Sequence, residues 1–95
     1  MGATVYIPTP LRPFTDNKDS LELEGSTVQE ILDDLISRYG ELKKHLFNED
    51  GKLRNFVNIY VNDEDIRYLE RENTPISDDD SISIVPSIAG GSYAV

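Results

Sequence analysis

Apolar and polar residues alternate in four segments of the chain, and a period of two residues is typical of β-strands with one buried face. These segments are residues 4–7, 20–24, 56–62 and 81–85. The third has the strongest pattern, with Val57, Ile59 and Val61 on one face. A weaker apolar segment, residues 66–69, follows after a polar turn and is predicted to be a short partner strand. The inward residues of the first two segments are Val5, Ile7, Leu21 and Leu23.

One segment shows the helical period instead. Six apolar residues recur at intervals that place them on one face of a helix: Val28, Ile31, Leu32, Leu35, Ile36 and Tyr39. Thr27 is predicted to be the N-cap, with Glu30 completing a capping box. Gly40 is expected to end this helix, and residues 42–47 are expected to form a short second helical turn.

The connecting segments are rich in proline and in turn-forming residues. Pro8, Pro10 and Pro13 are expected to exclude both a helix and central strand pairing from the segment that contains them. Residues 70–77 are predicted to be a polar loop. The order of elements is β-β-α-β-(β)-β, which predicts one α+β domain built around a single main helix.

The charge balance narrows the range of partners. The chain has 95 residues, with 18 acidic against 9 basic side chains and a formal net charge of -9. Nucleic acid is therefore excluded as a partner, whereas a protein with a basic docking surface would be attracted. No apolar run is long enough for a membrane span, and no signal peptide is present, so we expect a cytoplasmic protein without a membrane partner.

Side chains that could perform catalysis are scarce. The chain contains no cysteine, and His45 is its only histidine, which we interpret as a solvated or packing residue. The acidic runs at residues 63–65 and 78–80 are expected to be solvated turns, because neither has the spacing of a calcium loop. No glycine-rich phosphate loop is present. The sequence predicts a protein that is not an enzyme and that binds neither a metal nor a cofactor.

One face of the predicted sheet offers a candidate docking surface. If Val57 and Ile59 face the helix, then Phe56 and Tyr60 face outward, together with Tyr6 of the first strand. Outward aromatic side chains can form a docking patch for a partner. The alternative is that Phe56 and Tyr60 pack on cross-strand neighbours such as Tyr6, and both interpretations remain open.

The last predicted strand leads into a pair of glycines. Pro86 cannot donate a ladder hydrogen bond and is expected to release the chain from the sheet. Gly90 and Gly91 have no Cβ atom, so a partner's narrow channel could grip them as extended backbone and reach the carbonyl beyond. A glycine pair alone fits an unstructured tail equally well.

Three segments together make the glycine pair more informative. They are residues 7–13 (IPTPLRP), 52–67 (KLRNFVNIYVNDEDIR) and 84–91 (IVPSIAGG). The chain resembles the MoaD/ThiS family of ubiquitin-like sulfur carriers over nearly its whole length, and most closely the cysteine-synthase-linked, CysO-type members. This resemblance implies a β-grasp domain over residues 1–88, with a mixed sheet of four to five strands packed on one main helix. Residues 89–95 would then form a C-terminal tail.

The resemblance also implies a chemistry that needs no catalytic side chain in the carrier. In this family an E1-like enzyme uses ATP and Mg²⁺ to adenylate the C-terminal glycine, and sulfur then displaces AMP to leave a thiocarboxylate. Gly91 would carry the sulfur, and Ala89 and Gly90 would form the slender approach through the partner's channel. The CysO type implies a PLP-dependent, cysteine synthase-like enzyme as the acceptor and cysteine or a related sulfur amino acid as the product.

The chain departs from the family pattern after the second glycine. Residues 92–95 (SYAV) follow Gly91, and an amide between Gly91 and Ser92 has no free carboxylate to adenylate. Some relatives have short extensions that a zinc-dependent JAMM-type protease removes. We therefore expect this chain to be a precursor that is cleaved after Gly91. The alternative is that these residues are a remnant of cloning.

The same C-terminal glycine pair is compatible with other functions. Within the carrier class, the sulfur could go to molybdopterin, thiamin, tRNA or a natural product. A ubiquitin-like modifier would instead join Gly91 to lysines of other proteins through isopeptide bonds. A non-covalent regulatory β-grasp domain would not need Gly91 at all.

Overall fold

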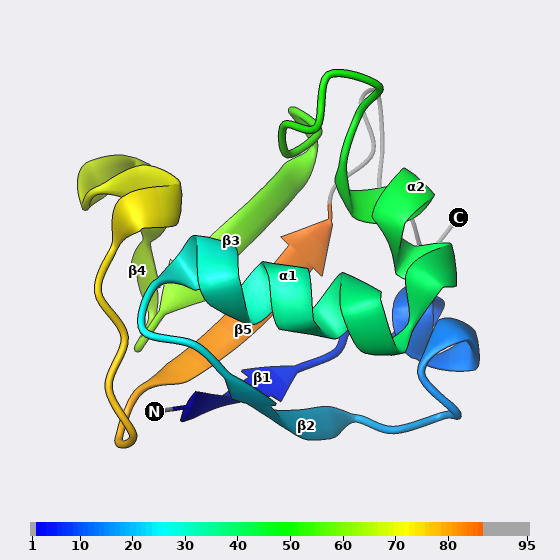
Figure 1. The fold of residues 1–95 in the computed structure, drawn as a ribbon, viewed down its shortest axis with the longest axis horizontal. Coiled ribbons are helices and arrows are strands. Elements are labelled where there is room, and N and C mark those ends of the chain that lie inside the picture. Colours follow the sequence, from blue (N-terminus) through cyan, green and yellow to red (C-terminus); the bar gives the residue numbers. More distant parts are fainter. Residues whose placement is uncertain (1, 87–95) are drawn as a thin grey trace.

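Five strands form one mixed sheet in the computed structural model, which describes residues 2–86. The strands are β1 (Gly2–Tyr6), β2 (Ser20–Glu24), β3 (Val57–Val61), β4 (Glu64–Asp65) and β5 (Ser81–Pro86). Their order in the sheet is β2-β1-β5-β3-β4, so the first and last strands lie side by side at its centre (Figure 1). β1 and β5 run parallel, and every other neighbouring pair is antiparallel. The predicted mixed sheet is confirmed.

The main helix, α1 (Val28–Arg38), lies across one face of this sheet (Figure 1). Its apolar stripe is buried as predicted, with Ile36 and Tyr39 at the margin. Against it pack the inward residues of the strands: Val5, Leu23, Val57, Ile59, Val61, Ile82 and Ile84. Burying such side chains is the dominant favourable contribution to folding. The alternation of the sequence therefore identified the core faces of β1, β2 and β3 correctly.

Both ends of α1 differ in detail from the prediction. The backbone N–H of Glu30 donates to Oγ1 of Thr27 at 3.2 Å, which confirms the N-cap. The Glu30 carboxylate, however, accepts from the backbone N–H of Ser26 at 2.8 Å, one residue before the cap. The helix ends at Arg38, with Tyr39 as the C-cap. Gly40 does not adopt the left-handed conformation of a glycine cap but begins the next helical turn.

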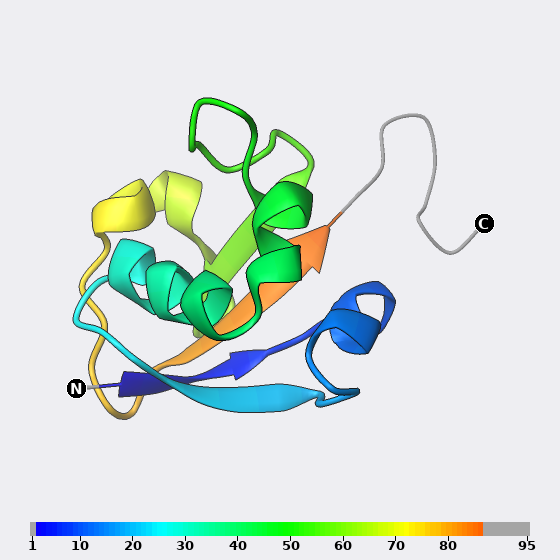
Figure 2. The ribbon, with the colours of Figure 1, turned by 45° about the vertical axis from the view of Figure 1, so that its right-hand side comes forward.

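The second helical turn is confirmed and continues the layer that covers the sheet. A 3-10 turn, η2 (Gly40–Leu42), leads directly into α2 (Lys43–Leu46). Figure 2 shows α1 and α2 on the same side of the sheet. Leu42, Leu46 and Phe47 are buried in the common core. No helix within residues 2–86 has the length and apolar character needed to cross a membrane.

The prediction that prolines exclude a helix from residues 8–13 is wrong. This segment forms a 3-10 helix, η1 (Thr9–Phe14). Its hydrogen bonds run from the N–H of Leu11 to the carbonyl of Pro8, at 2.9 Å, and from Thr15 to Arg12, at 3.0 Å. Pro10 lies in the first turn, where an N–H would have no partner within the helix, so only Pro13 removes a donor from inside it. Leu11 is buried and Phe14 packs against the core.

The short partner strand of β3 also differs from its prediction. Asn62 and Asp63 have φ values of 50° and 73°, so both residues adopt the left-handed conformation of a two-residue hairpin turn. The return strand β4 therefore begins at Glu64 and not at Ile66. Residues 66–68 form a 3-10 turn, η3 (Ile66–Tyr68), and the predicted polar loop contains another, η4 (Arg71–Asn73).

Candidate functional site

Strand β5 positions the start of the tail. It lies between β1 and β3 and ends at Pro86, whose register partner is Val57 of β3. Pro86 is the last residue of the strand and is buried. That it releases the chain from the sheet stays a prediction, because the residues after it lie outside the described part of the chain. The predicted tail residues Ala89, Gly90, Gly91 and Ser92 lie outside the described residues, as does the predicted domain boundary at residues 88 and 89. The described residues therefore include only the point where the tail begins, the end of β5 at Pro86, which we call the root of the tail.

Two of the three predicted docking residues share the outer face of the sheet. Tyr6 of β1 and Tyr60 of β3 are both register partners of Ser83 in β5, so the three form one row. Tyr6 is 50% exposed, and α1 covers the opposite face (Figure 2). Tyr60 and Tyr6 are not adjacent cross-strand partners, because β5 lies between their strands and Ser83 lies between the two residues.

Phe56 lies elsewhere. It precedes β3, which begins at Val57, and it lines a hollow at the end of the sheet where β5 ends. The three aromatic residues therefore do not form one patch: Tyr6 and Tyr60 belong to the sheet face, whereas Phe56 belongs to the root of the tail. Whether either surface binds a partner stays a prediction.

The hollow that contains Phe56 has a volume of about 350 Å³, and we call it the tail-root hollow. It combines residues from η1, α2, the segment before β3 and the end of β5: Pro10, Leu11, Phe14, Lys44, His45, Arg54, Phe56 and Pro86. The rings of Phe14 and His45 pack with their centres 4.5 Å apart, which confirms a packing role for His45. No pattern in the sequence indicates a role for Lys44 or Arg54, although basic residues are few in a chain with 18 acidic and 9 basic side chains.

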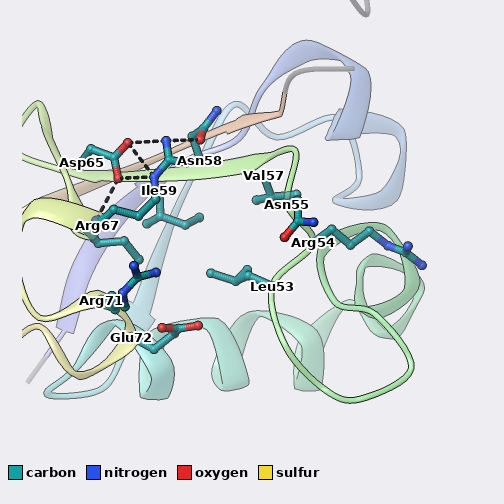
Figure 3. Close-up of a pocket in the computed structure, with 11 residues that line it drawn as sticks. Leu53, Arg54, Asn55, Val57, Asn58, Ile59, Asp65, Arg67, Arg71 and Glu72 are labelled. Atoms are coloured by element: carbon teal, nitrogen blue, oxygen red, sulfur yellow. Dashed lines mark hydrogen bonds and ion pairs between the residues drawn. The ribbon is translucent and has the colours of Figure 1, made fainter. Parts of the chain in front are cut away.

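A smaller hollow of about 130 Å³ lies between β3 and the η3–η4 segment (Figure 3). Nη2 of Arg67 lies 2.7 Å from Oδ2 of Asp65 and 2.7 Å from Oδ1 of Asn58. Asp65 is only 8% exposed, and its Oδ1 also accepts the backbone N–H of Arg67 at 2.9 Å. The side-chain and backbone hydrogen bonds from Arg67 lower the pKa of the Asp65 carboxyl. This ionic cluster joins β4 and η3 to β3.

The expectation that the acidic runs are solvated turns is wrong for Asp65, which is buried in β4, and Asp80 of the other run has a structural role. Oδ1 of Asp80 accepts a hydrogen bond from the Asn62 side chain at 2.8 Å, and its Oδ2 accepts the backbone N–H of Ser77 at 2.9 Å. These bonds lower the pKa of the Asp80 carboxyl. Asp80 thus ties the turn after β3 to the start of β5. Among residues 2–86, no group of three or more histidines and carboxylates is arranged to hold a metal ion.

The sequence is similar to curated sulfur carriers along nearly its whole length. It is 44% identical over 93 residues to the sulfur carrier protein CysO of Mycobacterium tuberculosis, covering 96% of this chain and all of the relative. It is 33% identical over 81 residues to a putative sulfur carrier protein of Archaeoglobus fulgidus, covering 83% of this chain and 92% of the relative.

The fold is also that of solved carrier structures. A chain in the crystal structure of the Amycolatopsis orientalis BexX/CysO complex matches with a TM-score of 0.84 and 45% identity, covering 94% of this chain and 99% of that one. Crystalline CysO of M. tuberculosis matches with a TM-score of 0.82 and 42% identity, covering 90% and 99%. The expected ubiquitin-like β-grasp fold is confirmed. The ThiS family model matches residues 5–91, ending on the second glycine, and this chain belongs to the ThiS family.

Proposed function

We propose that this protein is a sulfur carrier, and that Gly91 bears the sulfur as a thiocarboxylate. The observation that carries the proposal is the 44% identity to CysO across the whole of that carrier. The family match supports the assignment of Gly91, because it extends through both glycines and ends there, with residues 92–95 beyond its end. The relatives are named as carriers and not as enzymes.

The proposed activation has two steps, both performed in the active site of an E1-like partner that holds ATP and Mg²⁺. The Gly91 carboxylate attacks the α-phosphate of ATP, and pyrophosphate leaves. A sulfur nucleophile then attacks the resulting acyl adenylate, and AMP leaves. The adenylate is needed because a free carboxylate is a poor electrophile. This chain binds no cofactor in either step.

The contribution of this chain is to hold the root of the tail in a fixed position. Strand β5 has a hydrogen-bonded neighbour on each side, and Ile82 and Ile84 anchor it in the core. A partner that binds the outside of the domain therefore meets the tail at a defined point. Positioning of reacting groups in this way removes much of the entropic barrier of a reaction between two proteins.

Maturation must precede activation. The peptide bond between Gly91 and Ser92 leaves no free carboxylate on Gly91, so residues 92–95 have to be removed first. We assign this cleavage to a zinc-dependent JAMM-type protease. The end of the family match at Gly91 supports a removable extension beyond it.

The destination of the sulfur is a sulfur amino acid. We assign cysteine as the product and a PLP-dependent, cysteine synthase-like enzyme as the acceptor, on the strength of the likeness to CysO. That a CysO chain at 45% identity was crystallised with BexX supports docking of such carriers on partner proteins. We place these reactions in the cytoplasm.

The decisive experiment compares the full chain with a version that ends at Gly91. Each is incubated with ATP, Mg²⁺, a sulfide source and the E1-like enzyme of the same organism, and the products are weighed by mass spectrometry. Only the shortened chain should gain the mass of sulfur in place of oxygen. Conversion of the uncleaved chain would contradict the maturation step, and conversion of neither would contradict the carrier function.

A modifier function has one observation in its favour. The chain is 32% identical over 68 residues to small archaeal modifier protein 3 of Haloferax volcanii, covering 72% of this chain and 73% of the relative. A modifier would leave conjugates between Gly91 and lysines that survive denaturing gels. Such conjugates should be absent from native extracts if the protein is only a carrier.

A further inference from the structure

We propose that the tail-root hollow is a docking surface for acidic side chains at the mouth of the channel that takes up the tail. The proposal rests on the carrier function and adds the chemistry of the partner's contact surface. Three features carry it: the charge of the hollow, the fixed geometry of its cations and its position beside Pro86.

The charge of the hollow is opposite to that of the protein. The lining contains two cations, Lys44 and Arg54, and no carboxylate, although the chain has a formal net charge of -9. By contrast, the hollow beside the β3–β4 turn includes Asp63 and Glu64 in its lining. A cationic site within an acidic surface favours contact with carboxylates at this place and disfavours it elsewhere.

The cations have defined positions. The backbone N–H of Arg54 donates to the carbonyl of Leu46, and its Nε donates to the carbonyl of Lys44, both at 2.9 Å. The Nε bond orients the guanidinium, and its terminal nitrogens have no hydrogen bond to residues 2–86. A guanidinium with free terminal nitrogens can bind a carboxylate through two parallel bonds. Lys44 pairs with Glu41 at 3.3 Å, and both side chains are well exposed, so a partner's carboxylate can replace Glu41 at little cost.

The hollow also has an apolar part. The packed rings of Phe14 and His45 form one side of it, and Phe56, which is 38% exposed, belongs to the same lining. Apolar surface beside a cation gives a contact region that excludes water from the ion pair, which strengthens the attraction. A partner loop with a carboxylate next to an aliphatic or aromatic side chain fits this combination.

The position of the hollow links it to the tail. Pro86, the last residue of β5, is part of the lining. Gly91 is five residues further on, and five residues span at most about 17 Å. An enzyme that holds Gly91 in its active site must therefore bring the entrance of its channel close to the hollow. The net charge of the chain predicts a basic partner surface, whereas the local charge beside the tail predicts an acidic channel entrance.

The test measures adenylation of charge-reversed carriers by the E1-like enzyme of the same organism. All carriers end at Gly91, a length that retains every helix and strand between residues 2 and 86. The test variant is Lys44→Glu with Arg54→Glu. The matched control is Lys18→Glu with Arg71→Glu, which changes the net charge equally at two exposed residues outside the hollow. A third variant, Lys44→Arg, keeps both charges and leaves the oriented guanidinium of Arg54 in place. Circular dichroism confirms that each is folded.

The expected result is a rise of about tenfold or more in KM for the test variant. The control and the charge-preserving variant should stay within about twofold of the unmodified carrier. Equal KM values for the test variant and the control would overturn the docking surface and leave the carrier function intact. Equal loss in the test and charge-preserving variants would also overturn it, because charge would not be the cause. Failure of the unmodified carrier to be adenylated would overturn the carrier function and the docking surface with it.

Discussion

The Asp65–Arg67 pair makes a sharp prediction about what holds the edge of the sheet together. Asp65→Ala removes two interactions at once: the backbone hydrogen bond from Arg67 at 2.9 Å and the ion pair with its guanidinium at 2.7 Å. Asp65→Asn is the matched control. Its amide oxygen can still accept the backbone N–H of Arg67, but the charge is lost.

The magnitudes follow from the exposure of the two groups. An acceptor that caps the first turn of a helix is worth about 1 kcal/mol. The ion pair adds about 1 kcal/mol and no more, because the Arg67 side chain is 53% exposed and water screens the attraction. Asp65→Ala should therefore lower the free energy of unfolding by about 2 kcal/mol, and Asp65→Asn by about 1 kcal/mol.

The assay is urea unfolding followed by circular dichroism, at about pH 7 and again at about pH 2. Hydrogen bonds from Arg67 lower the pKa of the Asp65 carboxyl in the folded state. Its contribution is therefore complete above the carboxyl's ordinary pKa and is lost as the pH falls through the lowered value. The difference between wild type and Asp65→Asn should shrink towards zero at the lower pH.

Two results would refute this reasoning. If Asp65→Asn destabilises as much as Asp65→Ala, the backbone cap contributes nothing of its own. If the difference between wild type and Asp65→Asn is the same at both pH values, ionisation of Asp65 is not its source. Adenylation of either variant should be unaffected once it is folded, because Asp65 lies outside the tail-root hollow.

Three further predictions concern the fold that carries the tail. Leu32→Ala should lower the free energy of unfolding, measured with urea, by about 2–5 kcal/mol, because Leu32 lies on the buried face of α1 and is fully buried. A smaller loss would mean that the neighbouring side chains close the cavity left by the substitution. Gly25→Ala should cost more than Gly51→Ala, which should cost about 1 kcal/mol for its φ of 79° alone. A Cβ on Gly25 would lie 2.8 Å from the backbone nitrogen of Ile31, whereas one on Gly51 meets nothing; equal melting temperatures for the two variants would contradict this. Thr27→Ala should cost about 1 kcal/mol by the same unfolding assay, and no loss would show that Ser26 replaces the cap.

The features of the fold that depend on the periodicity of apolar residues could be predicted from the sequence. A strand with one buried face requires alternation, so the inward residues of β3 and the stripe of α1 followed from pattern alone. The errors arose where local backbone geometry decides. Two left-handed residues, Asn62 and Asp63, shortened the hairpin turn and moved the return strand to β4. Likewise, Pro10 lies in the first turn of η1, where no N–H is needed, and this short helix forms although Pro13 removes one donor from inside it.

The candidate site was only partly accessible from the sequence. Gly91 was predicted because the tail has its own signature in the sequence, which needs no tertiary structure. The tail-root hollow could not be found in this way, because Phe14, Lys44, Arg54 and Pro86 come from four separate segments. No periodic pattern links residues so far apart. The Phe14–His45 ring contact, the Arg54–Lys44 hydrogen bond and the pairing of Val57 with Pro86 bring these segments together.

The parallel pairing of β1 with β5 has a consequence for how the protein is made. Val5 and Ile82 are register partners, so the centre of the sheet joins segments from near the two ends of the described chain. Contacts between residues so distant in sequence form slowly, because the chain loses the entropy of closing a large loop before these contacts contribute any stabilisation. A growing chain cannot complete the sheet until β5 has been synthesised, because β5 lies between β1 and β3 and joins the two halves of the sheet. Completion of the fold and emergence of the segment that leads to the tail are therefore one event.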